Sequence, residues 1–127
     1  MTEQKLKILV VDDETSIGQI LKAGLEMHGF TVRYEPHSTD TIQTCLEFHP
    51  DLVLLDVDMP VKDGGVVASE LRSHPTLQRI PVIFLTSLVS KEETGKRNAS
   101  REILSKQIAV ADLVARIRAV LQPQTPP

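Results

Sequence analysis

Short apolar runs alternate with amphipathic segments along this chain. Three of the runs, KILVV (7–11), LVLL (52–55) and PVIFL (81–85), are continuous and bounded by polar residues or proline. Such runs are typical of strands that are buried on both faces. The run TVRYE (31–35) mixes apolar and polar residues, which favours a strand at the edge of a sheet, and EILS (102–105) is expected to form a fifth strand.

Between the strands, apolar residues recur at the spacing of a helix face. Gly29 follows the first of these stripes, at the point where a helix is expected to stop. Strands that alternate with helices predict an α/β fold built on a parallel sheet. The four stripes are Ile17, Ile20, Leu21, Gly24 and Leu25; Ile42, Cys45 and Leu46; Val67, Ala68 and Leu71; and Val110, Leu113, Val114, Ile117, Val120 and Leu121.

Two segments depart from this pattern. The segment SKEETGKRNASRE (90–102) opens with a capping box formed by Ser90 and Glu93 but has almost no apolar face afterwards. We therefore expect any helix over about 90–100 to be short or weakly held. The end of the chain, QPQTPP, is rich in proline and predicts an extended tail. The expected organisation is one domain over 1–121 and a tail over 122–127.

Composition narrows the class of protein. With 127 residues and 41% hydrophobic content, the chain has enough apolar surface for one ordinary core. A net charge of -3 argues against nucleic acid or an anionic membrane as a direct partner. Cys45 is the single cysteine and shares a helical stripe with Ile42 and Leu46, so we expect it in the core. The N-terminal residues do not read as a signal peptide or a membrane span, and a cytoplasmic location is expected.

Polar residues with reactive or charged groups follow the predicted strands. In an open parallel sheet the carboxyl ends of the strands line one crevice, where ligands bind. Converging carboxylates repel one another unless a cation compensates them, and an all-oxygen set of ligands suits Mg2+. The residues are Asp12, Asp13 and Glu14 after the first of these strands, Asp56 and Asp58 at the third, Thr86 and Ser87 at the fourth, and Lys106 at the fifth.

The same set of residues indicates phosphoryl chemistry. A protein-bound Mg2+ is usually completed by phosphate oxygens, and the hydroxyl of Thr86 and the ammonium of Lys106 are suited to bind them. A carboxylate close to both metal and lysine can act as nucleophile and form an acyl phosphate. Thr86 has no evident base to activate it, so Asp56 is the candidate nucleophile.

The motifs ILVVDDE, PDLVLLDVDMPVKDGG, PVIFLTS and ILSKQ resemble those of the response-regulator receiver domain of two-component signalling, from about Lys7 to Leu121. The resemblance implies a flavodoxin-like doubly wound (βα)5 fold with a five-stranded parallel sheet in the order 2-1-3-4-5. It implies that the domain takes a phosphoryl group from a histidine kinase or phosphotransfer protein. Such a domain catalyses only its own phosphorylation and dephosphorylation, and acts on an effector domain or a downstream protein.

The resemblance also assigns roles to the site residues by their position in the motifs. Asp56 corresponds to the phosphoacceptor, Lys106 to the lysine that pairs with a phosphoryl oxygen, and Thr86 to the hydroxyl that moves onto the phosphoryl group. Ser87 would contribute its backbone amide. For Mg2+, the implied ligands are the carboxylates of Asp13 and Asp56, the backbone carbonyl of Asp58, and Asp12 through a water.

Three features depart from the family pattern. Ile103 lies where receivers commonly carry a Tyr or Phe that swings inward, so we expect Thr86 to be coupled to the output face weakly or by another route. Gln107 replaces the proline that usually follows the lysine, so its peptide bond should be trans. The segment between Thr86 and Lys106 is short. In many receivers the surface formed by the fourth helix, fifth strand and fifth helix dimerises or contacts an effector, and the short segment puts this mode of interaction in question.

Two alternative functions follow from the same residues. The missing aromatic and proline are compatible with a receiver-like interaction module that does not depend on phosphorylation. The Asp-x-Asp of LLDVDMP also occurs in phosphatases of the haloacid-dehalogenase type, although there it follows the first core strand, whereas here paired acids come earlier in the chain. A homodimer is one of the assemblies left open.

Overall fold

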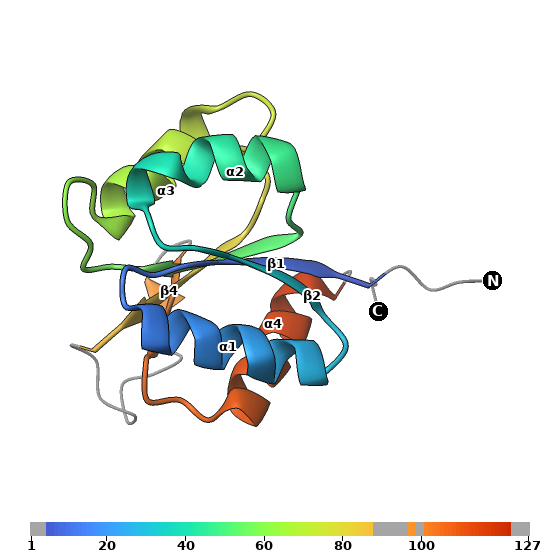
Figure 1. The fold of residues 1–127 in the computed structure, drawn as a ribbon. Coiled ribbons are helices and arrows are strands. Elements are labelled where there is room, and N and C mark those ends of the chain that lie inside the picture. Colours follow the sequence, from blue (N-terminus) through green and yellow to red (C-terminus); the bar gives the residue numbers. More distant parts are fainter. Residues whose placement is uncertain (1–4, 88–96, 99–100, 123–127) are drawn as a thin grey trace.

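A computed structural model describes residues 5–87, 97–98 and 101–122, which form one twisted sheet with two helices on each face (Figure 1). Five strands run parallel in the order β2-β1-β3-β4-β6, which confirms the predicted 2-1-3-4-5 arrangement. The strands are β1 (Lys7–Val11), β2 (Thr31–Glu35), β3 (Leu52–Asp56), β4 (Val82–Thr86), β5 (Arg97–Asn98) and β6 (Arg101–Ser105). The helices are α1 (Thr15–Met27), the 3-10 turn η1 (Ser38–Asp40), α2 (Thr41–Phe48), α3 (Gly64–Ser73) and α4 (Val110–Leu121).

The register of the sheet brings the strand ends together at one edge. On β1, Val11 pairs with Glu35 of β2 on one side and with Leu55 of β3 on the other. On the next pair of strands, Asp56 pairs with Leu85. Because the five strands are parallel and in step, the residues that follow them meet along one line.

The continuous apolar runs are explained by burial on both faces of the sheet. Alternate residues of β1 point to opposite sides, so that Ile8 packs in a core with α1 and α4 while Leu9 packs in a second core with α2 and α3. Figure 1 shows these two helix pairs on opposite faces of the sheet. The mixed strand β2 is at the edge, as predicted.

Cys45 is fully buried in the core beneath α2 and α3, which confirms its expected packing role. Burial in this apolar environment raises the pKa of its thiol to about 11.

The segment between β4 and β6 contains a strand that the sequence did not predict. Arg97–Asn98 pairs antiparallel with Arg101–Glu102 at the outer edge of the sheet. A strand of two residues is too short to produce a periodic pattern. The capping box at Ser90 and Glu93 lies outside the described residues. Of the expected weak helix over 90–100, only 97–98 are described.

The C-terminal helix α4 ends at Leu121, and 123–127 of the predicted tail lie outside the described residues. Among the helices of the described ranges, none has the length and apolar content needed to cross a bilayer.

Candidate functional site

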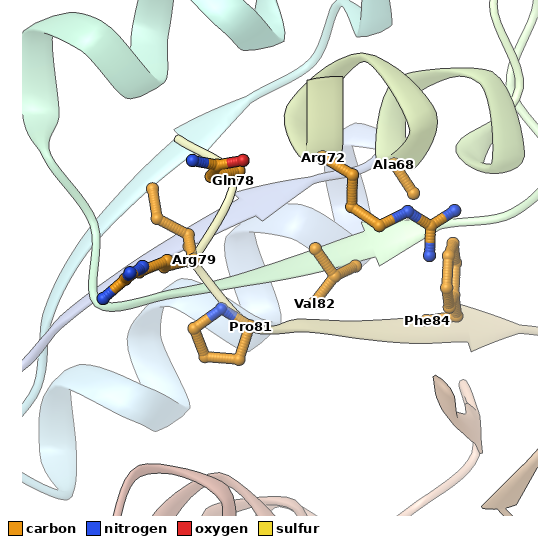
Figure 2. Close-up of a pocket in the computed structure, with 8 residues that line it drawn as sticks. Ala68, Arg72, Gln78, Arg79, Pro81, Val82 and Phe84 are labelled. Carbon is orange, nitrogen blue, oxygen red and sulfur yellow. The ribbon is translucent and has the colours of Figure 1, made fainter. Parts of the chain in front are cut away.

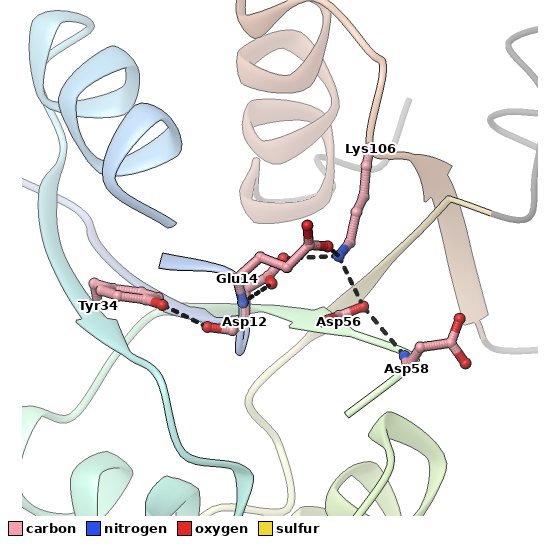
Figure 3. Close-up of polar contacts among 6 residues, drawn as sticks. All are labelled: Asp12, Glu14, Tyr34, Asp56, Asp58 and Lys106. Atoms are coloured by element: carbon pink, nitrogen blue, oxygen red, sulfur yellow. Dashed lines mark hydrogen bonds and ion pairs between the residues drawn. The ribbon is translucent and has the colours of Figure 1, made fainter. Parts of the chain in front are cut away.

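Three carboxylates converge at the carboxyl edge of the sheet (Figure 3). Asp12 follows β1, Asp56 is the last residue of β3, and both side chains are buried. Asp13 lies beside them and is exposed. One carboxylate oxygen from each of the three lies within 4.8 Å of the others. The sequence therefore predicted this cluster correctly, since it follows from the alignment of strand ends.

Lys106 is the positive charge at the centre of the cluster. Its Nζ lies 3.1 Å from Asp12 Oδ2, 3.2 Å from Asp56 Oδ1 and 3.0 Å from Glu14 Oε1. Its backbone N–H donates to the carbonyl of Thr86 at 3.0 Å, which fixes the start of the side chain next to the end of β4. The lysine therefore reaches across the sheet edge to the acidic turn that follows β1, as Figure 3 shows.

The electrostatic environment of Asp56 favours its protonated form. Burial and the negative charge of Asp12 raise the pKa of Asp56 to about 7, while Lys106 and the backbone N–H of Asp58 act in the opposite direction. For Lys106, burial by itself lowers the pKa, but hydrogen bonds and charges from Glu14, Asp12 and Asp56 outweigh it and raise the pKa above its ordinary value. One cation thus compensates only part of the negative charge around it.

The hydrogen bonds of the buried carboxylates leave oxygens available to a cation. Asp56 Oδ1 accepts the backbone N–H of Asp58 at 3.1 Å, and Asp12 Oδ1 accepts that of Glu14 at 2.8 Å. Among the described residues, Asp56 Oδ2 is buried and accepts no hydrogen bond, and Asp12 Oδ2 has only the ion pair with Lys106. Buried polar atoms are normally satisfied, so an unpartnered carboxylate oxygen in an all-oxygen cluster fits Mg2+ as the missing partner.

The loop after Asp56 is shaped by close backbone approach at Gly64. A Cβ at this position would lie 2.5 Å from the carbonyl oxygen of Asp56 and 3.0 Å from Val57 Cα, so only glycine fits. The Asp63 side chain accepts the N–H of Val66 at 2.9 Å and caps α3. These contacts fix the loop that carries Asp58. The backbone of Asp58 faces the site, although Asp58 is an exposed residue.

The remaining predicted residues lie at the end of β4. Thr86 is buried and pairs with Ser105 of the neighbouring strand, and Ser87 follows it and is exposed. The register places Thr86 one residue beyond Leu85, the partner of Asp56. The fold thus brings this strand end to the same edge as the acidic cluster.

Two contacts of the site were missed by the sequence. Glu14 was noted only as part of an acidic run, yet its carboxylate binds Lys106. Tyr34, on the edge strand β2, donates its hydroxyl to the backbone carbonyl of Asp12 at 2.6 Å. The acidic run was a usable signal for Glu14, whereas a single tyrosine in a mixed strand gave none for Tyr34.

Two departures from the family pattern can be located in the structure. Ile103 is half-buried and packs against the core beneath α2 and α3. The peptide bonds of the described residues include no cis bond, so the bond between Lys106 and Gln107 is trans, as predicted.

The fold is thus a parallel sheet that carries a buried acidic cluster and a lysine at its carboxyl edge. The family model of the response regulator receiver domain matches residues 8–118. This chain therefore belongs to the response regulator receiver domain family.

Relatives and solved structures agree with this assignment. The chain is 39% identical over 121 residues to the probable transcriptional regulator ycf27 of Porphyridium aerugineum, a match that covers 94% of this chain and 49% of that protein. The chain thus spans about half the length of the curated relatives it matches. The BeF3-activated N-terminal receiver domain of Klebsiella pneumoniae RstA is 32% identical with a TM-score of 0.77, covering 92% of this chain and 99% of that one. Vibrio cholerae CheY4 is 26% identical with a TM-score of 0.79, covering 93% and 100%.

Proposed function

We propose that this domain receives a phosphoryl group on Asp56 in a Mg2+-dependent reaction and thereby switches its interactions with other proteins. The observation that carries the proposal is the buried Asp56 carboxylate, which has Lys106 at 3.2 Å from Oδ1 and an Oδ2 that accepts no hydrogen bond from the part of the chain that the structure describes. A structural aspartate at a strand end would normally satisfy both oxygens.

The reaction is a transfer between two protein side chains. A carboxylate oxygen of Asp56 forms a bond to the phosphorus of a phosphohistidine on the donor, and the P–N bond breaks. The imidazole leaves with the electron pair of that bond and takes a proton, and Asp56 becomes an acyl phosphate. Hydrolysis of this acyl phosphate by water releases inorganic phosphate and returns Asp56 to a carboxylate, so the domain acts on no separate substrate.

The side chains around Asp56 then bind the phosphoryl group. The Lys106 ammonium stays protonated and pairs with a phosphoryl oxygen, and the Thr86 hydroxyl and the Ser87 backbone amide donate to the others. The residues that would hold Mg2+ are Asp13, Asp56, the Asp58 carbonyl and, through a water, Asp12. The metal supplies positive charge that offsets the negative charge of the incoming phosphoryl group.

The partners follow from this chemistry and from the relatives. The donor is a histidine kinase or a phosphotransfer protein of the cytoplasm. The relatives named transcriptional regulators are about twice as long as the match, which supports an effector domain or a downstream protein as the receiver of the signal. The net charge of -3 gives this domain itself no electrostatic attraction for nucleic acid or membranes.

The proposal is tested by intact-mass spectrometry after incubation with Mg2+ and acetyl phosphate. We expect one phosphoryl adduct that is stable in acid and labile in base. The adduct should be absent with EDTA and absent in Asp56→Asn, which keeps the shape of the side chain but removes its negative charge.

Two other outcomes identify the alternatives. A protein that takes no phosphate from acetyl phosphate or from a panel of purified histidine kinases would be a phosphorylation-independent interaction module. Sustained turnover of a small phosphate ester such as p-nitrophenyl phosphate would indicate a phosphatase of the haloacid-dehalogenase type, which membership of the receiver family does not favour.

A further inference from the structure

The hydroxyl of Tyr34 donates a hydrogen bond to a backbone carbonyl beside the acidic cluster, in the place of a missing backbone donor. Tyr34 lies on the edge strand β2, and Asp12 is the first residue beyond the end of β1. The Tyr34 hydroxyl donates to the backbone carbonyl of Asp12 at 2.6 Å (Figure 3). Asp12 also donates its own backbone N–H to the carbonyl of Glu35 at 3.3 Å. Both backbone groups of Asp12 are therefore held by the end of β2.

The backbone donor is missing because the parallel hydrogen bonding between β1 and β2 ends at Asp12 and Glu35. In a parallel pair, a residue that donates to Glu35 would accept, through its carbonyl, the N–H of His37. Here the chain turns at Pro36, and the His37 N–H donates to the side-chain Oε2 of Glu35 at 2.9 Å instead. The Asp12 carbonyl thus loses its expected backbone donor, and the Tyr34 hydroxyl takes that place.

The ring of Tyr34 reaches this position because helix α1 has a glycine beneath it. A Cβ on Gly18 would lie 2.5 Å from the ring carbon Cζ and 2.6 Å from Cδ1, inside any allowed contact. Gly18 is otherwise a poor choice in the interior of a helix, where glycine costs about 1 kcal/mol relative to alanine. The pair of Gly18 and Tyr34 therefore acts as one unit that fixes the turn between β1 and α1.

This turn carries the residues that face the cation. Asp12 and Asp13 contribute to the carboxylate cluster, and Glu14 binds Lys106 while its N–H is accepted by Asp12 Oδ1. A shift of the Asp12 backbone would move all three side chains, because they are consecutive in the chain.

We propose that Tyr34 is a positioning residue for Mg2+ binding, which acts by holding the Asp12 backbone through its hydroxyl with its ring seated on Gly18. The inference rests on the proposed function, since it takes Asp12 and Asp13 to face the metal. Tyr34 itself donates no ligand. Its effect is to preset the position of the carboxylates before the cation arrives.

The test is a direct titration of Mg2+ into wild-type protein and Tyr34→Phe by isothermal titration calorimetry. The variant keeps the ring and removes only the hydroxyl. We expect its Kd for Mg2+ to rise by about 10-fold, the lower end of the range found when groups that orient metal ligands are removed. In the acetyl phosphate reaction, the Mg2+ concentration at half-maximal rate should rise by the same factor while the rate at saturating Mg2+ changes little.

A second variant displaces the Tyr34 hydroxyl without changing Tyr34 itself. Gly18→Ala keeps Tyr34 but forces its ring off the helix, so we expect a similar rise in the Kd. Tyr34 is the only tyrosine and the chain has no tryptophan, so its intrinsic fluorescence reports directly on whether the ring has moved.

A control separates positioning from simple loss of stability. Ile117 is fully buried in α4, and Ile117→Val removes one methylene at a cost of about 0.5–1.5 kcal/mol, which is comparable to the loss of one hydrogen bond. We expect Ile117→Val to leave the Kd unchanged. Equal Kd values for wild type and Tyr34→Phe would overturn the inference and leave the proposed function intact, whereas no Mg2+ binding by wild type would overturn both.

Discussion

Lys106 Nζ lies 3.2 Å from Asp56 Oδ1, and each of the two side chains is more than nine-tenths buried. The same ammonium contacts Asp12 and Glu14, so one cation faces three carboxylates. An excess of buried negative charge is unfavourable for the protein alone and favourable for binding a second cation. The following predictions depend on this imbalance.

Replacement of Lys106 by methionine should have opposite effects on folding and on metal binding. Without Mg2+, loss of the ammonium leaves Asp12 and Asp56 without a counter-charge, and we expect the free energy of unfolding to fall by about 3–5 kcal/mol in urea titrations. Affinity for Mg2+ should rise by about 10-fold, because the site becomes more negative. Phosphorylation of Lys106→Met by acetyl phosphate should nevertheless be slower, since the phosphoryl group loses its cationic partner.

Lys62→Met is the matched control for this experiment. Lys62 pairs with Glu70 at 2.8 Å, but both side chains are about one-third exposed, and such surface pairs contribute about 0–1 kcal/mol. Equal losses of stability in the two methionine variants would contradict the central role of Lys106.

Asp56 should make the metal-free domain less stable as the pH rises. The pKa of Asp56 is raised to about 7 in the folded state, so the folded protein keeps a proton that the unfolded chain releases near pH 4. The free energy of unfolding should therefore fall between about pH 4 and pH 7, by about 1.4 kcal/mol per pH unit at most, and then level off. Urea titrations in EDTA at pH 5, 6 and 7 measure this slope.

The variant Asp56→Asn lacks this titration and should be more stable than wild type at pH 7 by about 1–3 kcal/mol in EDTA. The advantage should shrink toward pH 4.5, where Asp56 is protonated in wild type, and should also shrink in saturating Mg2+. A stability difference that stays constant from pH 4.5 to 7 would show that Asp56 keeps an ordinary pKa.

Mg2+ should stabilise the folded domain through Asp13. At a Mg2+ concentration ten times the Kd, binding adds about 1.4 kcal/mol, which corresponds to a rise in Tm of about 5 °C for a domain of this size. Asp13→Asn should abolish most of this rise in differential scanning fluorimetry. Asp112→Asn, at another exposed acid, is the control and should keep it. A full rise in Asp13→Asn would exclude Asp13 as a ligand.

The positions of the site residues were predictable because parallel strands have a regular geometry. Asp12, Asp56 and Lys106 were placed together by a single rule, that the carboxyl ends of parallel strands share one edge. The order of the five long strands did not follow from this rule and was implied instead by the resemblance of the motifs to the receiver family. The strongest predictions were thus those that depended on continuous apolar runs and on strand direction.

The contacts that the sequence did not predict depend on local details without a periodic signal. The Tyr34 hydroxyl bonds to Asp12 only because Pro36 turns the chain and His37 bonds to Glu35. Strand β5 has two residues and forms by pairing with β6 rather than by a pattern of its own. Such features follow from tertiary structure, which a reading of periodicity along one chain does not contain.

Gly64 should tolerate no side chain, although it begins a helix where alanine would ordinarily be favourable. A methyl group at Gly64 meets the backbone of Asp56 and Val57, neither of which can move without displacing the Asp56 carboxylate. We expect Gly64→Ala to lower the free energy of unfolding by about 1–3 kcal/mol and to slow phosphorylation by acetyl phosphate. Gly65→Ala is the control, because its Cβ would meet only the Asp63 side chain at 3.3 Å, and helix propensity should offset this contact. If urea titration and intact-mass spectrometry gave the same result for both alanine variants, the close approach at Gly64 would not be what holds Asp56 in place.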